Sequence, residues 1–315
     1  MTSTVGNSTL STAVNSTMTM TSAPLTSKAT TDMKDSEYHI VLLVIYSVVL
    51  LCGTISLSLM MHIMKSTSIS TTSIAVLNLI FAHFIFLLTV PFRIYYYAAN
   101  HWSLSWGWCK MVSSMIHIHM YMSFVFYVII LITRLLTFYN KANRMVHFQR
   151  IHAFLLSAFV WIAVLFVVPC VIHFSYGQQP KGKDKSNNTD GHCFQFGTSI
   201  ETAIVSNYIA STLIIVVATT LTALQAKVLW VLYKKHRQGC TSQQDFGAQL
   251  KSMCFALIMV VCFIPYHLFR LYYLKNIHLQ NVNEVFLSLT TFNCLDMLTF
   301  MGRRTCNICF VRRIF

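Results

Sequence analysis

The chain has 315 residues, of which 55% are hydrophobic and only 10% charged, and its formal net charge is +14. A soluble domain of this length typically carries about 25% charged residues, so the composition excludes a soluble globular protein. The net positive charge would also fit a nucleic-acid-binding protein. The basic residues lie at the ends of long apolar stretches, however, and this position excludes that partner.

The apolar residues fall in seven long blocks. A helix that spans a bilayer needs roughly 20 mostly apolar residues, because each residue adds about 1.5 Å along the axis. Lipid offers no partner for backbone N–H and C=O groups, and the blocks are far longer than the strands of a membrane barrel. The sequence therefore predicts an all-α membrane protein, a bundle of seven transmembrane helices, over residues 39–64, 73–97, 110–138, 152–174, 202–233, 252–275 and 283–301.

The segment before the first span, residues 1–37, is rich in Ser and Thr and contains no apolar run. This composition predicts a disordered tail, and no signal peptide is visible in it. Asn7 and Asn15 begin N-glycosylation sequons in the tail, and Asn187 begins a third one in the loop after the fourth span. Glycosylation at these three residues is expected if both segments are extracellular.

The Lys and Arg residues cluster after the first, third, fifth and seventh spans, at positions such as Lys65, Arg144, Lys234 and Arg303. All these segments lie on one side of the membrane if there are seven spans. Short loops rich in Lys and Arg remain cytoplasmic, so the N-terminus is predicted to be extracellular. The domain organisation is then a glycosylated tail (1–37), a seven-helix membrane domain (38–302) and a short basic cytoplasmic tail (303–315).

Most of the ten cysteines lie inside the spans, where they are expected to act as small packing residues. Cys109 opens the third span on the predicted outer side, and Cys193 lies in the outer loop before the fifth. Both would meet an oxidising compartment, where a disulfide between them would hold that loop over the bundle. Cys306 and Cys309 follow the last span, where they are either palmitoylation sites or idle cytosolic thiols.

Several short motifs occur in order at fitting spacing. They are Leu77-Asn78-Leu79, Thr89-Val90-Pro91-Phe92-Arg93, Trp102 seven residues before Cys109, Arg134 twenty-five residues after Cys109, Trp161, Cys262-Phe263-Ile264-Pro265-Tyr266-His267 with Arg270, and Asn293-Cys294-Leu295-Asp296. Over roughly residues 40–310 the chain thereby resembles the class A, rhodopsin-like, G-protein-coupled receptors, and within them the purinergic-receptor branch. The strings 117–121 and 262–273 resemble those of one orphan receptor.

The resemblance implies a receptor that transmits an extracellular signal to a heterotrimeric G protein through switch residues that include Arg134, Phe263 and Pro265. The chain also departs from the family pattern. The departures are Thr54 in the first span, His83 in place of the span-two Asp, Thr133 and Leu135 beside Arg134, no Pro in the fifth span, Met297 and Phe300. They favour an alternative, a non-signalling seven-helix scaffold or decoy receptor that modulates other receptors. A transporter or channel would need several charged residues along its pathway, and only Asp296 is clearly deep in a span.

A carboxylate inside the membrane costs about 3 kcal/mol on insertion scales, so Asp296 is expected to have a partner. In the family that partner is the span-two Asp, around a sodium ion, but here His83 takes its place. Since hard cations prefer oxygen ligands, we expect no sodium site and instead a His83–Asp296 hydrogen bond, with Thr54 and Asn78 nearby. This cluster is either a structural link between helices or a protonation-sensitive switch.

Arg134 lies at the predicted inner end of the third span. Its neighbour Thr133 cannot form the ion pair that an acidic residue forms there in the family, so we expect raised basal activity. The alternative is that Arg134 only reaches the anionic lipid headgroups.

The outer ends of the spans carry the residues that the family geometry would place around a ligand. They are Arg93, Tyr97, Met115, His119, His267, Arg270 and Glu284. The two arginines favour an anionic, partly apolar ligand, such as a lipid acid or a nucleotide-like molecule, because Arg captures carboxylate or phosphate in a bidentate manner. Interfacial positions in an aromatic and basic belt are the alternative for each residue.

His117 and His119 point to different faces of a helix, so they are not expected to form a metal pair. The sequence contains no phosphate-binding glycine loop, paired carboxylates or nucleophile elbow, so neither an enzyme nor a cofactor is expected. The expected partners are a G protein, an extracellular ligand and membrane lipids, with no nucleic acid.

Overall fold

The computed structural model describes residues 25–64, 71–139, 146–176, 193–194, 204–237 and 243–296. These ranges contain helices and no strand. The long helices are α1 (Leu25–Met64), α2 (Thr71–Ala99), α3 (Trp106–Tyr139), α4 (Val146–Tyr176), α5 (Ile204–Arg237) and α6 (Gln243–Tyr273). A short 3-10 helix, η3 (Ile277–Leu279), then leads into α7 (Gln280–Leu289), which continues as a second 3-10 helix, η4 (Thr290–Leu295).

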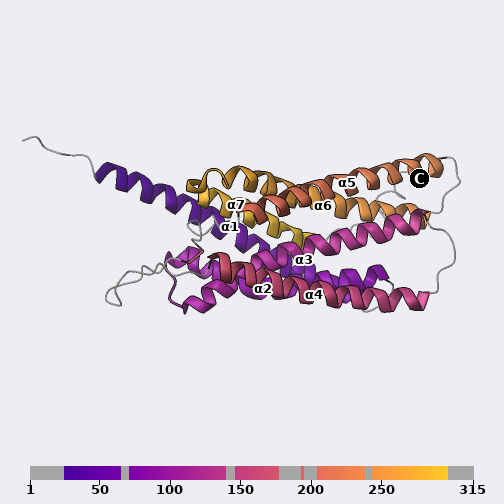
Figure 1. The fold of residues 1–315 in the computed structure, drawn as a ribbon, viewed down its shortest axis with the longest axis horizontal. Helices are drawn as coiled ribbons and strands as arrows, with labels where there is room; N and C mark the ends of the chain where they lie inside the picture. The colour runs from indigo at the N-terminus through magenta and orange to yellow at the C-terminus, as the bar shows by residue number, and fades with distance from the viewer. Residues whose placement is uncertain are drawn as a thin grey trace, which may run out of the picture.

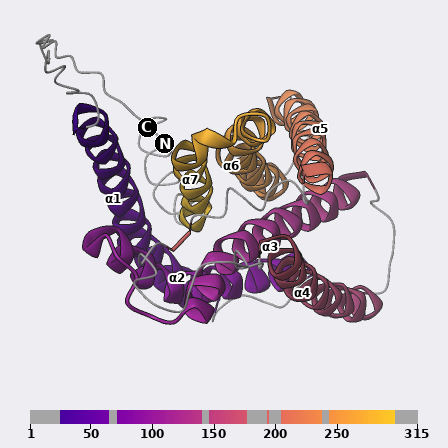
Figure 2. The ribbon, with the colours of Figure 1, turned by 60° about the vertical axis from the view of Figure 1, so that its left-hand side comes forward.

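The helices form one elongated bundle, which confirms the predicted fold class. In Figure 1 they run side by side along the long axis, and Figure 2 shows α3 passing through the middle of the others. α3 contacts α2, α4, α5, α6 and η4, whereas α5 packs mainly along α6. α3 therefore connects the two halves of the bundle.

The outward-facing surface of the bundle is strongly apolar. On α4, Phe159, Ile162 and Phe166 are 67%, 70% and 70% exposed. Water would not stabilise such a surface, whereas lipid would. Six of the described helices are long and apolar enough to cross a membrane, and each overlaps one of the first six predicted blocks.

Most of the helices begin before their predicted apolar blocks, and α1 and α6 do so by the largest margins. α1 begins at Leu25, inside the segment predicted to be a disordered tail, and α6 begins at Gln243 rather than near residue 252. Hydropathy marks only the part of a helix that lies in lipid, and neither Gly nor Pro interrupts the sequence from Leu25 to Cys52. The helices therefore extend past their apolar blocks.

The seventh predicted span is represented by α7 and η4, since residues 297–301 lie outside the described ranges. The change from α to 3-10 geometry coincides with a run of hydroxyl side chains that bond to the backbone. Thr290 donates to the carbonyl of Leu287 and Thr291 to that of Ser288, both at 2.6 Å. Such local bonds compete with regular helix bonding. They precede Asn293, Cys294 and Asp296, which η4 directs into the core.

Candidate functional site

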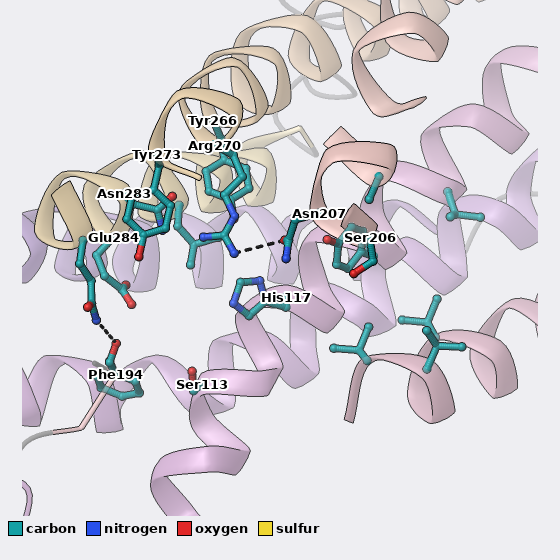
Figure 3. Close-up of a pocket in the computed structure, with 18 of the residues that line it drawn as sticks. Ser113, His117, Phe194, Ser206, Asn207, Tyr266, Arg270, Tyr273, Asn283 and Glu284 are labelled. Carbon is teal, nitrogen blue, oxygen red and sulfur yellow. Dashed lines mark hydrogen bonds between the residues drawn. The ribbon is translucent and has the colours of Figure 1, made fainter. Parts of the chain in front are cut away.

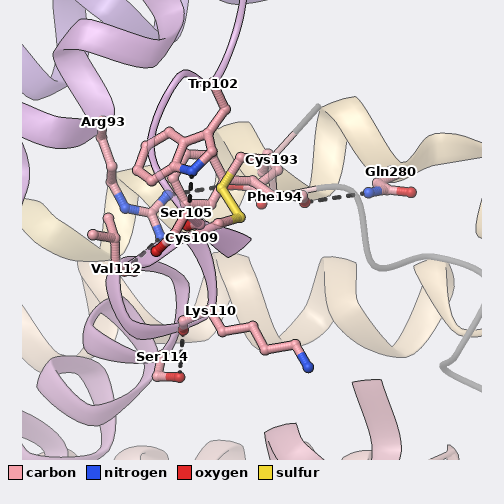
Figure 4. The surroundings of a disulfide bond; sticks show 11 residues. Arg93, Trp102, Ser105, Cys109, Lys110, Val112, Ser114, Cys193, Phe194 and Gln280 are labelled. Carbon is pink, nitrogen blue, oxygen red and sulfur yellow. Dashed lines mark hydrogen bonds and ion pairs between the residues drawn. A yellow bond between two sulfur atoms is a disulfide. The ribbon is translucent and has the colours of Figure 1, made fainter. Parts of the chain in front are cut away.

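The predicted disulfide between Cys109 and Cys193 is present, with Cα atoms 5.8 Å apart (Figure 4). It lies near the start of α3, at what we call the disulfide end of the bundle. The bond fixes the adjacent Phe194. The backbone of Phe194 has a left-handed φ of 71°, which residues other than glycine rarely adopt. Phe194 packs against the rings of Tyr96 and Trp102, so the covalent bond and the aromatic contacts together hold it in this conformation.

Arg93 lies directly behind Phe194. Its guanidinium carbon is 4.3 Å from the centre of the Phe194 ring, and its side chain donates to the carbonyl of Val112 at 3.3 Å (Figure 4). The same side chain donates to Tyr46 Oη at 3.2 Å. Arg93 Nη1 is also 3.9 Å from Glu284 Oε2. Arg93 is fully buried, so its charge is compensated within the protein.

A cavity of about 460 Å³ lies between the helices at the disulfide end (Figure 3). Its polar wall combines Arg270 of α6 and Asn207 of α5, which are joined by a 3.2 Å hydrogen bond, with His117 of α3, which points toward them. The other lining residues are Ser113, Tyr121, Val125, Ala163, Val164, Val167, Val168, Phe194, Ser206, Ala210, Tyr266, Tyr273, Gln280, Asn283, Glu284 and Leu287.

Two of the seven predicted ligand residues, Arg270 and Glu284, line this cavity. The other five lie elsewhere. Arg93 lies behind the cavity wall. Beside Arg93, the ring of Tyr97 stacks on that of Tyr46 with the ring centres 5.8 Å apart. Met115 packs against the hydrophobic core. His267 Nδ1 is 3.2 Å from Ser211 Oγ, at the contact between α6 and α5.

His119, the fifth of these, faces α2 rather than the cavity. Its Nε2 atom is 2.9 Å from His83 Nδ1, and its ring stacks on Phe86. The sequence showed that His117 and His119 face apart, which is confirmed, but not which of them faces the cavity. That choice depends on the rotation of α3 about its axis, so His117 was missed as a lining residue.

A polar centre lies deeper in the bundle, around Asp296. The predicted His83–Asp296 contact is confirmed, with His83 Nε2 at 3.3 Å from Asp296 Oδ2. The sequence did not indicate Tyr127 of α3, which donates to the same carboxylate oxygen at 2.6 Å. Phe263 of α6 packs against Phe124 and Tyr127, so this predicted switch residue borders the polar centre. Pro265 lies inside α6 and its side chain is exposed.

The expectation that Thr54 and Asn78 lie near this centre is wrong. Thr54 is exposed and donates to the carbonyl of Leu51. Asn78 faces α4, where it donates to Ser157 at 3.1 Å and accepts from the indole of Trp161 at 2.8 Å. α2 turns His83 and Asn78 toward different neighbours because they are five residues apart on a helix.

At the other end of α3, Arg134 is half-buried, and its carbonyl is 3.5 Å from Gln249 Nε2 of α6. Gln249 also accepts from Gln225 of α5 at 2.6 Å, and both glutamines are buried. Amide groups therefore connect α3, α5 and α6 beside Arg134. The predicted glycosylation sites Asn7, Asn15 and Asn187 and the predicted palmitoylation sites Cys306 and Cys309 lie outside the described residues.

Comparison with known proteins agrees with this architecture. A sequence model of the family described as 7 transmembrane receptor (rhodopsin family) matches residues 56–299. The chain is 35% identical to "Probable G-protein coupled receptor 141" of Homo sapiens over 271 residues, which are 82% of this chain and 87% of that protein.

Two more distant relatives are similar over most of the chain. "Cysteinyl leukotriene receptor 2" of Mus musculus is 24% identical over 234 residues, 72% of this chain and 73% of that protein. "Probable G-protein coupled receptor 34" of Pan troglodytes is 24% identical over 296 residues, 86% and 74% of the two chains. The family is one of receptors and not a class of enzymes. The chain is therefore a multi-pass membrane protein that belongs to the rhodopsin family of seven-transmembrane receptors, the class A G-protein-coupled receptors.

Proposed function

We propose that this receptor lies in the plasma membrane with its N-terminus outside and couples an extracellular ligand to a heterotrimeric G protein. Family membership supports the general activity. The orientation is supported by α3, since Cys109 is near one end of this helix and Arg134 near the other. Disulfides persist in oxidising compartments, so the disulfide end faces outward and Arg134 faces the cytosol.

The ligand is an amphipathic anion. Around the cavity, Arg93 and Arg270 bring two guanidinium groups and Glu284 one carboxylate, so basic groups outnumber acidic ones among the described residues there. Asn283 also lines the cavity, and its buried amide oxygen has no hydrogen-bond partner among the described residues, so it can accept a bond from a ligand. Arg270 lines the cavity, where its guanidinium can bind a carboxylate or phosphate in a bidentate manner.

The apolar part of the ligand would lie toward α4. There the cavity wall consists of Ala163, Val164, Val167 and Val168, with Val125 of α3 opposite. These five side chains carry no polar group, whereas Arg270, Asn207 and His117 form the polar wall. The cavity thus fits a molecule with an anionic head and an apolar chain better than a free nucleotide. One relative carries cysteinyl leukotrienes in its name, which agrees with a lipid-derived ligand.

The cavity and the polar centre share three helices, which gives a route for the signal. His117 and Tyr266 line the cavity, while Tyr127 and Phe263 on the same two helices border the polar centre. Glu284 and Leu287 of α7 lead along the same chain to Asp296. A ligand that binds one arrangement of α3, α6 and α7 more tightly would shift the population toward that arrangement.

Nucleotide exchange on a panel of purified G proteins, measured with the receptor in membranes, tests the coupling. We expect exchange by at least one G protein without added ligand, and its loss in Arg134→Ala at equal surface expression. Exchange that is unchanged in Arg134→Ala would contradict the role of this residue. Silence across the panel with verified surface expression would favour the scaffold or decoy receptor instead.

Binding of oleate, oleoyl lysophosphatidate and ATP to the purified receptor tests the ligand class, with neutral monooleoylglycerol as the comparison. We expect the two lipid anions to bind and Arg270→Gln to weaken them by about tenfold or more, since a hydrogen bond to a charged group contributes about 1.5–3 kcal/mol. Lys275→Gln is the matched control, because it removes an exposed positive charge near the same end of the bundle. Equal binding of the neutral lipid, or binding of ATP alone, would contradict an amphipathic anion.

A further inference from the structure

Three potential metal ligands from three different helices meet beside the polar centre. His83 Nδ1 of α2 and His119 Nε2 of α3 are 2.9 Å apart, and Cys294 Sγ of η4 is 3.7 Å from the former and 3.5 Å from the latter. All three side chains are buried. None of them lines the cavity, so the cluster is separate from the proposed ligand site.

These separations match the edges of a tetrahedral zinc site. With Zn–N of about 2.05 Å and Zn–S of about 2.3 Å, tetrahedral angles place nitrogen and sulfur about 3.55 Å apart and two nitrogens about 3.35 Å apart. The two observed nitrogen–sulfur distances lie within about 0.2 Å of that value. Only the two ring nitrogens, which are 2.9 Å apart, must separate by about 0.4 Å to admit the ion.

At His83, a neighbour of the cluster provides what such a site requires. A histidine that binds a metal usually donates its other ring N–H to a carboxylate, which orients the ring. His83 meets this condition, because its Nε2 atom faces Asp296 at 3.3 Å and leaves Nδ1 directed at the cluster. Asp296 is itself held by Tyr127 at 2.6 Å.

Charge selects the ion. A Zn²⁺ ion bound by the Cys294 thiolate and two neutral imidazoles carries one positive charge, and the Asp296 carboxylate behind His83 compensates it. The assembly is then neutral, which matters in the low-dielectric interior of a membrane protein. Sodium would find two nitrogens and a sulfur instead of the oxygen ligands that hard cations prefer.

We propose that His83, His119 and Cys294 form a buried zinc site that ties α2, α3 and η4 together. Binding replaces the thiol proton of Cys294 and requires both imidazoles to be neutral. The fourth coordination position can be taken by water, as in other sites with three protein ligands. Ser123, one turn beyond His119, is a candidate to bond that water, since its buried hydroxyl has no partner among the described residues.

The metal content of the full-length receptor tests this site. The chain is produced in zinc-supplemented cells, purified in detergent without chelators, and analysed by inductively coupled plasma mass spectrometry. We expect about one zinc per chain, as for a single site with protein ligands. We also expect chelation to lower the thermal unfolding midpoint and added Zn²⁺ to restore it, because a ligand of the folded state stabilises that state.

Variants locate the ion. Cys294→Ser and His119→Asn should each lose most of the bound zinc, while Asp296→Asn should keep the site but weaken its zinc affinity by about 10–100-fold. Cys254→Ser and His267→Asn are the matched controls, since they alter a half-buried thiol and a buried histidine of α6 outside the cluster. Loss of zinc in the controls to the same extent as in the cluster variants would overturn the assignment.

Cobalt substitution gives an answer even if the cluster variants fail to fold. In the unaltered chain, Co²⁺ exchanged for zinc should show near-ultraviolet charge-transfer absorption from a thiolate ligand. A chain that binds no zinc, that binds only sodium or copper, or that binds Co²⁺ without thiolate absorption would refute the site. These measurements do not involve a G protein, so their failure would leave the proposed receptor function untouched.

Discussion

Tyr127 Oη donates a 2.6 Å hydrogen bond to Asp296 Oδ2, which joins the middle of α3 to the end of η4. Both side chains are fully buried. The bond therefore links a helix that contacts most of the bundle to the segment that follows the cavity wall in α7.

Tyr127→Phe should lower the thermal unfolding midpoint of the purified receptor. The change leaves the ring in place and removes one donor from a buried carboxylate, which costs about 1–2 kcal/mol, between the values for interhelical bonds in membranes and for bonds to charged groups. Tyr139→Phe is the control, because Tyr139 is 62% exposed at the end of α3. Equal midpoints for the two variants would mean that the Tyr127 bond contributes nothing to stability.

Arg93, which is fully buried, and Glu284, whose side chain is 17% exposed, form a pair whose members should depend on each other. Arg93→Met leaves the Glu284 carboxylate without its cation, and Glu284→Gln leaves the Arg93 charge without its anion. Each single change should be destabilising, but by less than the about 3–5 kcal/mol of a fully buried pair, because Glu284 is partly open to the cavity. The stability lost by the double variant should be clearly smaller than the sum of the stabilities lost by the two single variants.

Thermal unfolding of the four proteins of this cycle measures the coupling between the two residues. Lys275→Met, an exposed cation near the same end, should leave the unfolding midpoint unchanged. Strictly additive losses would show that the 3.9 Å contact carries no interaction energy.

The disulfide should act as a single unit. Cys109→Ser, Cys193→Ser and the double variant each remove the same bond, so all three should lower the unfolding midpoint equally. The expected loss is about 2–4 kcal/mol, since the bond closes a long loop in the unfolded chain. Cys52→Ser, which alters a free thiol of α1, should have little effect. A double variant that is clearly less stable than either single variant would contradict this expectation.

Gln225 and Gln249 connect α5 to α6 through a buried 2.6 Å hydrogen bond. Replacing either one by Leu leaves the other amide without its partner, which costs about 1–3 kcal/mol. The double replacement Gln225→Leu/Gln249→Leu should recover part of that loss, because two apolar side chains can pack together. Unfolding midpoints check this, and a double variant as unstable as the sum of the singles would contradict it.

Much of the architecture was predictable from local sequence. Helix positions followed from the apolar blocks, because each span in lipid must satisfy its own backbone hydrogen bonds. The disulfide followed from two cysteines at the predicted outer side. The His83–Asp296 contact followed from the need of one intramembrane carboxylate for a partner.

The cavity wall was predicted less well, and the reason is geometric. Arg93, Tyr97 and His119 do lie near the expected level of the bundle, but each faces another helix instead of the cavity. A residue two positions along a helix points about 160° away, since each residue turns the helix by about 100°. His117 and His119 therefore lie on nearly opposite faces of α3, and the sequence does not fix the rotation of α3 that decides which of them faces the cavity.

The sequence by itself determined that the chain crosses a membrane as helices and that its basic residues gather after alternate spans. It also determined that the chain resembles a receptor family. Only the tertiary structure decided that Arg270 and Glu284 share a cavity while Arg93 stands behind it, and that His83, His119 and Cys294 meet. Hydropathy and charge are properties of single segments, whereas contacts between segments depend on how the helices rotate and pack. Residues as far apart as His83 and Cys294 are brought together only by that packing.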